Sequence, residues 1–435
     1  MDKTQENLER WCSTEGLQFK DTEAEKKYRQ RTRRITDVIQ LKVPDRVPVM
    51  PSFGGFVAYN AGMTTEDVMF DAAKGQEATI KLLTEYEPDS GLPGGLTFEL
   101  YEAIDYKALK LAGRGIPADA GMQYVEGEYA TAEEFYDSFI FDPTDFMLRR
   151  FLPRIVGLME PLQALPPLNQ AFCYYLGLPQ VVSALAMPQI AGVFESISKA
   201  VMPILQKGAA MFAATNEIIS LGFPMTMGGP AHAPFDTIGD FIRGTKGIMI
   251  DMYRRPGKLL EALEKMVPIH INSALSLNPG APPFVFFPLH KGSDGFMSLD
   301  QFKTFYWPTL RRVVMAVIEA GFVPCLFWEG STNNARLEII ADIPRGKAIY
   351  HFEKVDLRKA KEILGNTVCI KGNVPLSLLM VGTAEQVREY VKELIDVAGK
   401  GGGLIVDSSA VIDKAKPENI KTMMDFAKEY GVYRT

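Results

Sequence analysis

The sequence predicts an α/β protein built as a (β/α)8 TIM barrel with an N-terminal helical arm and insertions. Three observations carry this prediction. From residue 284 onward, five apolar strand-like runs alternate with amphipathic helical segments, at the spacing of parallel strand–helix–strand units. The runs are continuously apolar, which is typical of parallel strands covered on both faces. Polar residues follow the ends of the runs, where barrels of this class carry their chemistry.

The N-terminal half is less regular than the rest. We expect residues 1–40 to form a charged helical arm and residues 41–435 to form the barrel. The run RVPVMPSF predicts the first strand, and TTEDVMFDAAKGQEATIKLLTEYEP predicts the next helix, with Thr64 or Thr65 as its cap. PDSGLPGG would end the second strand. Residues 95–165, rich in proline and aromatic residues, predict an insertion, and FPMTMGGPAHAP predicts another strand end.

The C-terminal half predicts its elements in a clear order. Phe284 to Leu289 predicts a strand, and a helix follows from about Ser298. The runs VPCLFWEG, KAIYHFE, TVCIKGNVP and GGGLIVDSS predict the remaining strands. Short polar residues are expected to cap the helices in between: Asn333 or Asn334, Asp356 and Thr383. Pro417 stands at the first turn expected for the last helix.

Composition argues against several classes of function. The 435 residues carry a net charge of −6, whereas nucleic acids and anionic membranes bind clustered Lys and Arg. No apolar run approaches the ~18 residues of a membrane-spanning helix. The opening MDKTQENLERW lacks the apolar core of a secretion signal. The four cysteines (Cys12, Cys173, Cys325 and Cys369) form no CxxC pair, which favours reduced thiols and a cytoplasmic location.

Ionisable and polar residues gather where the predicted strands end. They are His290, Glu329, His351, Glu353, Asn373, Asp407 and Ser409. Because carboxyl ends of barrel strands meet on one face, we expect these side chains to surround a single site. The chain has only four histidines, and two of them stand at these ends.

Glu329, His351 and His290 are the candidates for catalysis, and the first two are central. The Glu329 carboxylate follows an apolar strand, where an isolated charge is costly, so it requires a partner. That partner could be a metal ion or a basic side chain, and a role as general acid or base is a further alternative. His351 is a candidate ligand or acid–base group, with a hydrogen-bonded structural histidine as the alternative. One strand–helix–strand step separates the two residues, so adjacent strand ends could bring them to a common ion.

Further residues are candidates for binding a substrate. His290 and Lys291 lie in the loop PLHKGSDGF, which could contact a substrate or cofactor or be held by its own hydrogen bonds. Phe53, Tyr59 and Trp328 would give an aromatic site, although such residues are more often part of the core. Asn373, after a predicted strand, is also a candidate.

From FDTIGDF to the C-terminus the chain resembles the uroporphyrinogen decarboxylase-like superfamily. The resemblance rests on RGTKG followed by MYRRP, MSLDQFKTFYWPTLRRVV, KVDLRKAKEILGNTVCIKGNVP and GLIVD followed by KPENIKTM, in this order. True uroporphyrinogen decarboxylases have an arginine-rich segment (RQAGRY) near the first strand end, which binds substrate carboxylates. The corresponding place here reads VMPSFGGFVAYNAG, without arginine, so a substrate with many carboxylates would lack its guanidinium partners.

The other branch of the superfamily comprises corrinoid-dependent methyltransferases. Members that act on thiols bind zinc through an HxC pair and a cysteine after the last strand. Here the HxC pair is replaced by Phe327-Trp328-Glu329, and Ser409 stands near the position of the cysteine. FWEG and IYHFE resemble the branch that starts O-demethylation of methoxylated aromatic compounds such as veratrol. This resemblance implies Zn²⁺ held by Glu329 and His351, with Glu353, Asp407 or Ser409 as the third ligand.

The resemblance also implies a reaction and its partners. The enzyme would cleave a methyl ether, in particular that of a methoxylated aromatic compound, and would pass the methyl group to cob(I)alamin, giving methylcobalamin. No corrinoid-binding DxHxxG is recognisable, so the cobalamin would be carried by a separate corrinoid protein. Oxygen and nitrogen ligands leave zinc more acidic than thiolates do, which suits an oxygen leaving group. Related barrels often pair, which implies a homodimer.

Two other functions compete with this hypothesis. A metal-independent decarboxylase or lyase on the same barrel would use His351 or Glu329 as an acid and would need no corrinoid protein. A binding protein without catalysis would hold its ligand without turnover. Ionisable groups at several strand ends favour an enzyme over the binding protein.

Overall fold

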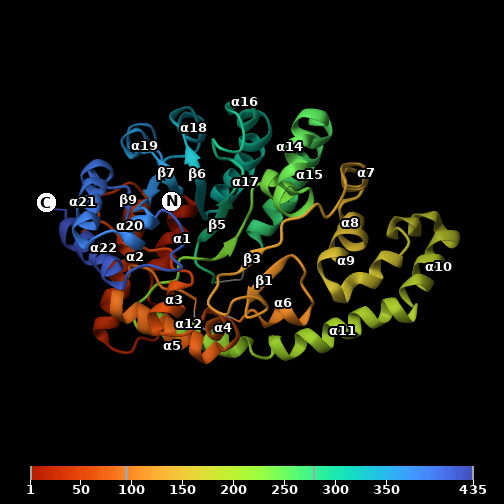
Figure 1. Ribbon diagram of the computed structural model, residues 1–435, viewed down its shortest axis with the longest axis horizontal. Coiled ribbons are helices and arrows are strands. Elements are labelled where there is room, and N and C mark those ends of the chain that lie inside the picture. Colours follow the sequence, from red (N-terminus) through yellow and green to blue (C-terminus); the bar gives the residue numbers. More distant parts are fainter. Residues whose placement is uncertain (1, 94–96, 278–279, 434–435) are drawn as a thin grey trace.

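A parallel six-stranded sheet forms the centre of the computed structural model, which describes residues 2–93, 97–277 and 280–433. The strand order is β4-β5-β6-β7-β8-β9, so each strand lies beside its neighbour in sequence (Figure 1). The strands are β4 (Gly229–Pro230), β5 (Phe284–Leu289), β6 (Val323–Thr332), β7 (Ile349–Val355), β8 (Cys369–Lys371) and β9 (Leu404–Ile405). The five parallel strands predicted for the C-terminal half are thus confirmed.

The sheet does not close into a regular barrel of eight strands. Among the described residues, the two strands expected before β4 are irregular segments, and residues 94–96 of PDSGLPGG lie outside the description. Backbone hydrogen bonds still join the segments to the sheet: Met50 N to Val406 O, Asp89 N to Val49 O and Gly91 N to Pro224 O. Pro48 and Pro51 have no N–H to donate, which prevents a continuous ladder in the first segment. The prediction of eight strands is therefore wrong for this half of the chain.

Helices pack around the outside of the sheet in the C-terminal half (Figure 1). They are α13 (Pro234–Asp236), α14 (Gly244–Arg254), α15 (Pro256–Leu275), α16 (Leu299–Gln301), α17 (Trp307–Glu319), α18 (Asn334–Ile340), α19 (Leu357–Leu364), α20 (Leu376–Val381), α21 (Ala384–Leu394) and α22 (Pro417–Tyr430). The predicted caps are confirmed, because side chains of Asn333, Asp356 and Thr383 accept backbone hydrogen bonds at their helix starts. Pro417 lies in the first turn of α22, as predicted.

The N-terminal segments form short helices and connections. They include α1 (Lys3–Cys12), α2 (Thr22–Ile39), α3 (Phe56–Ala61), α4 (Thr65–Phe70) and α5 (Ala72–Tyr86). The single helix expected after residue 64 is divided at Asp71, whose side chain accepts two backbone N–H groups at the start of α5. Thr64 caps α4 through a capping box, which decides between the two predicted caps.

Residues 99–220 extend from the sheet as an insertion and a projecting helical arm (Figure 1). The insertion contains a small sheet of β1 (Leu109–Ala112), β2 (Gly115–Ile116) and β3 (Gln123–Tyr124), with α6 (Glu99–Ala103), α7 (Ala132–Phe141), α8 (Pro143–Phe146) and α9 (Leu152–Ile155). The arm consists of α10 (Tyr174–Leu185), α11 (Pro188–Leu205) and α12 (Gly208–Ser220). Within the described residues no single helix meets the criteria for a membrane span, although one bent pair, Gly157–Leu185 with Pro188–Ser220, does by length and composition.

Successive side chains of a strand point to opposite faces of the sheet. One face packs against the helices as the hydrophobic core, and the other is the inner face. Phe287, Trp328 and Tyr350 belong to the buried cluster that packs against the surrounding helices. Residues one position away on each strand point to the opposite face, as the period of a strand requires. This alternation decides which of the predicted residues reach the site.

Candidate functional site

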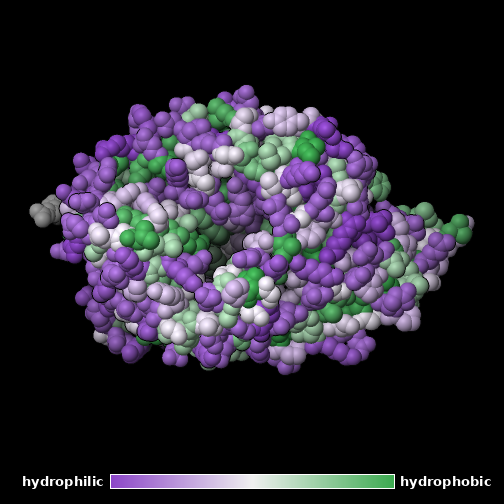
Figure 2. Space-filling model, viewed as in Figure 1, coloured by the Kyte–Doolittle hydropathy of each residue, from purple (hydrophilic) through white to green (hydrophobic). Residues whose placement is uncertain are grey.

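A cavity of about 360 Å³ lies on the inner face of the sheet. Alternate residues of β5, β6 and β7 line it: Phe284 and Phe286, Cys325 and Phe327, and Ile349 and His351. Figure 2 shows a hollow near the middle of this face, beside the strands of the central sheet seen in Figure 1. The walls are mostly apolar, which is the usual lining of a small-molecule site with a few polar groups to orient the ligand.

A cluster of polar side chains closes one end of this cavity. Asp407, which is fully buried, accepts hydrogen bonds from Ser52 N (2.7 Å) and Ser52 Oγ (2.6 Å). Lys371 Nζ lies 3.0 Å from Asp407 Oδ2, and His351 Nε2 lies 3.6 Å from the same oxygen. Burial alone would raise the pKa of Asp407, but the charge of Lys371 and the hydrogen bonds from Ser52 and Lys371 outweigh it and hold the pKa below its ordinary value. Asp407 is therefore an anion at neutral pH.

His351 is a neutral member of this cluster. Burial lowers the pKa of its imidazole to about 4, despite the nearby charge of Asp407. Its Nε2 lies 2.8 Å from Ser408 O, and a carbonyl can only accept, so Nε2 carries the proton. The ring stacks on Phe327 with centroids 4.3 Å apart. His351 consequently presents a flat, uncharged face to the cavity.

A second polar cluster lies farther along the strands, towards their carboxyl ends. His290 follows β5, and its Nδ1 is 2.6 Å from Asp240 Oδ2. Its other nitrogen, Nε2, lies 3.6 Å from Glu329 Oε1 on β6. Lys291 Nζ lies 2.9 Å from Asp240 Oδ1 and donates a 2.9 Å hydrogen bond to Thr245 Oγ1. The imidazole is thus held between two carboxylates.

The surrounding charges keep His290 protonated. Burial alone would lower its pKa, but the hydrogen bond with Asp240 and the charges of Asp240, Asp236 and Glu329 raise it to about 9. Burial raises the pKa of Glu329 as well. Asp236 is fully buried and accepts from the backbone N–H groups of His290 and Lys291 and from Tyr306 OH (2.7 Å). The result is a positioned imidazolium that lines a separate, smaller cavity of about 130 Å³.

The zinc ligands expected from the resemblance are not gathered in the structure. Glu329 lies beside His290, whereas His351 belongs to the Asp407 cluster. Glu353 Oε2 accepts a 2.6 Å hydrogen bond from Gly330 N. Across residues 2–93, 97–277 and 280–433, no three His, Cys, Asp or Glu side chains lie close enough to hold one metal ion. The expected set Glu329, His351 and Glu353 therefore does not fit a zinc ion in this structure.

The other predicted residues are divided between the cavity and the scaffold. Phe53 lines the cavity. Tyr59 is 49% exposed on α3 and is outside the cavity lining. Trp328 faces the helices, and its ring centroid lies 6.3 Å from that of Trp307. Asn373 is buried, and its Oδ1 accepts from Tyr390 OH. Ser409, the alternative third ligand, accepts a hydrogen bond from a backbone N–H (3.1 Å).

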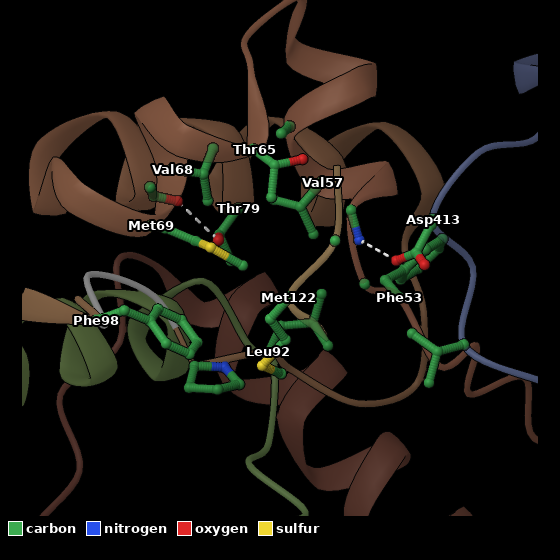
Figure 3. A pocket seen from close by; sticks show the side chains of 17 residues that line it. Phe53, Val57, Thr65, Val68, Met69, Thr79, Leu92, Phe98, Met122 and Asp413 are labelled. Atoms are coloured by element: carbon green, nitrogen blue, oxygen red, sulfur yellow. Dashed lines mark hydrogen bonds between the residues drawn. The ribbon is translucent and has the colours of Figure 1, made fainter. Parts of the chain in front are cut away.

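An adjoining cavity of about 380 Å³ shares part of its wall with the first. Both are lined by Phe53, Leu92, Pro93 and Val411. Figure 3 shows Phe53 beside Asp413, whose Oδ1 accepts a hydrogen bond from Gly55 N (2.8 Å). The labelled side chains of Val57, Val68, Met69 and Met122 make most of this second wall apolar. It extends the apolar space available to a ligand beyond Phe53.

Four residues of the two polar clusters were not predicted from the sequence: Ser52, Asp236, Asp240 and Lys371. Asp236 and Asp240 are four residues apart in FDTIGDF, a spacing that places both on one side of a helical turn. Lys371 ends the apolar run TVCI, where an ionisable residue is unusual. These signals were present, but their partners are up to 355 residues away in the chain, as for Ser52 and Asp407.

The parallel sheet makes this an α/β protein. Ionisable side chains and an apolar cavity near the strand ends are typical of enzymes with such a sheet. The uroporphyrinogen decarboxylase (URO-D) family matches residues 192–430, which is more than half of the chain. The chain belongs to this family. The match begins inside α11 and includes every strand of the central sheet.

Individual relatives are distant and of two kinds. A uroporphyrinogen decarboxylase of Trichodesmium erythraeum is 27% identical over 179 residues, covering 40% of this chain and 46% of the relative. The methylcobamide:CoM methyltransferase MtbA of Methanosarcina acetivorans is 28% identical over 123 residues, covering 28% of this chain and 35% of the relative. The chain thus spans less than half the length of these two relatives.

The fold is shared with a solved methyltransferase structure. A methyltransferase from Methanosarcina mazei superposes with a TM-score of 0.57, covering 92% of this chain and 98% of that chain. The sequence identity is 16%, so the likeness concerns the fold. Both kinds of chemistry occur among the relatives, and the choice between them depends on the site.

Proposed function

We propose that this protein is a methyltransferase that cleaves a methyl ether, such as a methoxylated aromatic compound, and passes the methyl group to cob(I)alamin on a corrinoid protein. The observation that carries the proposal is a protonated His290, which lines a small cavity with the aromatic side chains of Tyr124, Tyr129 and Phe241 and follows a strand that also lines the larger apolar cavity. The distant similarity to MtbA supports methyl transfer linked to a corrinoid. The shape and lining of the cavity support an aryl group as the substrate body.

The cavity and the His290 cluster are arranged in successive layers. Phe286 on β5 and Phe327 on β6 line the cavity, and the same alternation leads to His290 and Glu329 nearer the carboxyl ends. An aryl ring between the phenylalanines would direct its methoxy group towards the His290 imidazolium. The methyl carbon then faces the mouth, where a partner protein can approach.

His290 is the proposed general acid. The corrinoid supplies the nucleophile for the methyl carbon when its carrier protein docks. As the carbon–oxygen bond breaks, its electron pair remains on oxygen, and His290 Nε2 transfers its proton there, so the product is an alcohol or phenol. Asp240 holds Nδ1 in place through its 2.6 Å contact, and Glu329 stabilises the imidazolium before the transfer. A neutral leaving group lowers the barrier that makes ethers unreactive.

Decarboxylation of a porphyrinogen is the alternative within the family. Such a substrate carries many carboxylates, which are best bound by guanidinium groups. Among the described residues that line the 360 Å³ cavity, the cationic side chain is Lys371, and Asp407 already pairs with it. The lining therefore favours a substrate with little negative charge.

The direct test mixes the protein with cob(I)alamin and a panel of methyl ethers. We expect the absorbance of methylcobalamin to appear with at least one methoxylated aromatic compound, together with the demethylated phenol. Carbon dioxide release from a porphyrinogen, without methyl transfer from any ether, would instead identify a decarboxylase. Metal analysis accompanies the assay. If the protein contains stoichiometric zinc and Glu329→Ala loses it, the metal ion, and not His290, would stabilise the oxygen of the leaving group.

The pH profile provides a sharper prediction. The acid must be protonated, so activity should be sustained below the His290 pKa of about 9 and fall as the pH rises through it. Asp240→Asn removes the contact that raises this pKa most, so the falling limb should move down towards the ordinary value of 6.5. The measurement is kcat against pH for both proteins. A limb that stays in place would show that another group provides the proton.

A further inference from the structure

The adjoining cavity of about 380 Å³ combines apolar walls with one ionisable group. Helices α3, α4 and α5 line it, together with the loop before β3 and the chain between β9 and α22. Among the described residues of this lining, Asp413 alone has an ionisable side chain. Figure 3 shows Asp413 and Phe53 at one side of the cavity and Val68 and Met69 at the other. A ligand that fills this space would therefore place apolar surface against most of the wall and one group beside a carboxylate.

The carboxylate of Asp413 has no cationic partner within the described part of the chain. Its Oδ1 accepts a hydrogen bond from Gly55 N (2.8 Å), and no described residue donates to its Oδ2. Lys414, the next residue, pairs with Asp119 instead (Nζ to Oδ2, 2.8 Å). Asp413 thus places a negative charge that no side chain neutralises at the edge of an apolar space. Apolar walls reduce electrostatic screening, so a cation bound there would be attracted more strongly than in bulk water.

Glycine at position 121 keeps the second oxygen of this carboxylate open. A Cβ at Gly121 would lie 3.6 Å from Asp413 Oδ2, an ordinary contact distance. Among the described residues outside its own stretch of chain, the Asp413 carboxylate is the only group that this Cβ would meet within 4 Å. The φ of Gly121 is not positive, so the backbone does not require glycine there. A larger side chain would fit and would cover Oδ2, whereas glycine leaves this oxygen accessible.

Aromatic rings complete the surroundings of a cation at this end of the cavity. Phe53 lies beside Asp413 in Figure 3, and its ring stacks on that of Phe56 with centroids 5.7 Å apart. Phe98 contributes a second aromatic ring to the lining. Aromatic faces attract cations, and they are the usual recognition elements of alkylated ammonium ions. Asp413 and Phe53 therefore suit a positive charge, and the opposite wall suits an apolar body.

Three other kinds of ligand fit this cavity less well. A metal ion needs several ligands, and the described residues contain no group of three His, Cys, Asp or Glu that could hold one. A primary ammonium has three N–H donors, and one carboxylate leaves the others facing the apolar wall. Alkyl groups on the nitrogen remove these donors and contact the wall instead. A neutral ligand would cover Asp413 without compensating its charge.

We propose that this cavity binds an organic ammonium ion with apolar substituents, with its nitrogen beside Asp413 Oδ2 and its apolar body towards Val68 and Met69. The site does not depend on the proposed methyl transfer. Phe53 lines both cavities, so the ammonium ion lies across this side chain from a substrate in the 360 Å³ cavity. Its occupancy can be measured as binding, without turnover.

Isothermal titration calorimetry with benzyltrimethylammonium tests the site on the full-length protein. We expect one ion to bind per chain, and Asp413→Asn to weaken its binding at least roughly tenfold. Asparagine keeps an oxygen for Gly55 N, so the charge is lost while this hydrogen bond is retained. Asp425→Asn is the matched control, because it removes an exposed carboxylate outside the lining and should leave the affinity unchanged. Unchanged affinity in Asp413→Asn, or no binding to wild type, would overturn the proposal.

A neutral probe separates charge recognition from apolar contact. Benzyl dimethyl carbinol is close in shape to benzyltrimethylammonium but carries no charge, so we expect it to bind wild type at least roughly tenfold more weakly. Gly121→Val places a side chain over Asp413 Oδ2 and should weaken binding of the cation much more than that of the carbinol. Val68→Trp fills the opposite wall and should weaken both. If the carbinol binds wild type as tightly as the cation, or if Gly121→Val binds the cation normally, the nitrogen is not held at Asp413 and the proposal is wrong.

Discussion

His290→Gln is expected to slow methyl transfer by about 10²- to 10⁴-fold, the range typical of losing a general acid. The imidazolium donates a proton only as the carbon–oxygen bond breaks, so the loss should fall on kcat, with KM changed little. Glutamine can still hydrogen-bond to Asp240, which keeps the local structure, but it has no proton to give at neutral pH. Single-turnover formation of methylcobalamin measures the effect directly.

The control for this variant is His270→Gln. His270 lies on α15, is buried, and its pKa is lowered by burial to about 4, so it is neutral and outside the proposed chemistry. We expect a near-normal kcat from the folded control protein. A loss of less than tenfold in His290→Gln, with the substrate demethylated as before, would remove His290 from the role of acid.

The elements that the sequence predicts well are those set by local interactions. Asn333, Asp356 and Thr383 cap helices because their side chains bond backbone groups two or three residues away. The irregular first segments could not be predicted in this way. Pro48 and Pro51 weaken any strand there, and only long-range hydrogen bonds, such as Met50 N to Val406 O, attach the segment to the sheet.

The sequence predicts that polar residues gather at the strand ends, but it does not predict which of them lie together. Polar residues do gather at strand ends, as the alternation of strands and helices indicated. However, the register pairs His351 with Phe327, so Glu329 lies two residues, or about 7 Å, farther along its strand. The register also shifts between Trp328 and Ser331. Register depends on how whole strands pack, and no feature of either run determines it.

The same dependence on distant partners explains why the charge of His290 could not be predicted from the sequence. Its loop position suggested contact with a ligand, but its charge comes from Asp240, 50 residues earlier in the chain. Asp236 then fixes the backbone of the loop, through two N–H groups that no sequence pattern reveals. The protonation of the proposed acid is thus set by its neighbours, and the fold brings those neighbours together.

Asp89→Ala is expected to lower the free energy of unfolding by about 3–5 kcal/mol, the cost of leaving buried charges without their partner. Asp89 is fully buried, and its Oδ1 lies 2.6 Å from Arg34 Nη1 and 2.8 Å from Arg46 Nη2. Burial alone would raise its pKa, but the charges of Arg46 and Arg34 outweigh it and hold the pKa below the ordinary value. The carboxylate also accepts from Val49 N (2.7 Å), so it joins α2 to the irregular first segment.

Denaturant unfolding distinguishes this role from that of a surface ion pair. Asp425→Ala is the matched control, because Asp425 pairs with Lys421 on the exposed face of α22, and its loss should change stability by less than about 0.5 kcal/mol. If Asp89→Ala were equally mild, the two arginines would be solvated in the folded protein, and the link at Asp89 would not hold the first segment against the sheet. A large difference between the two variants would show that this buried carboxylate replaces the strand pairing that Pro48 and Pro51 prevent.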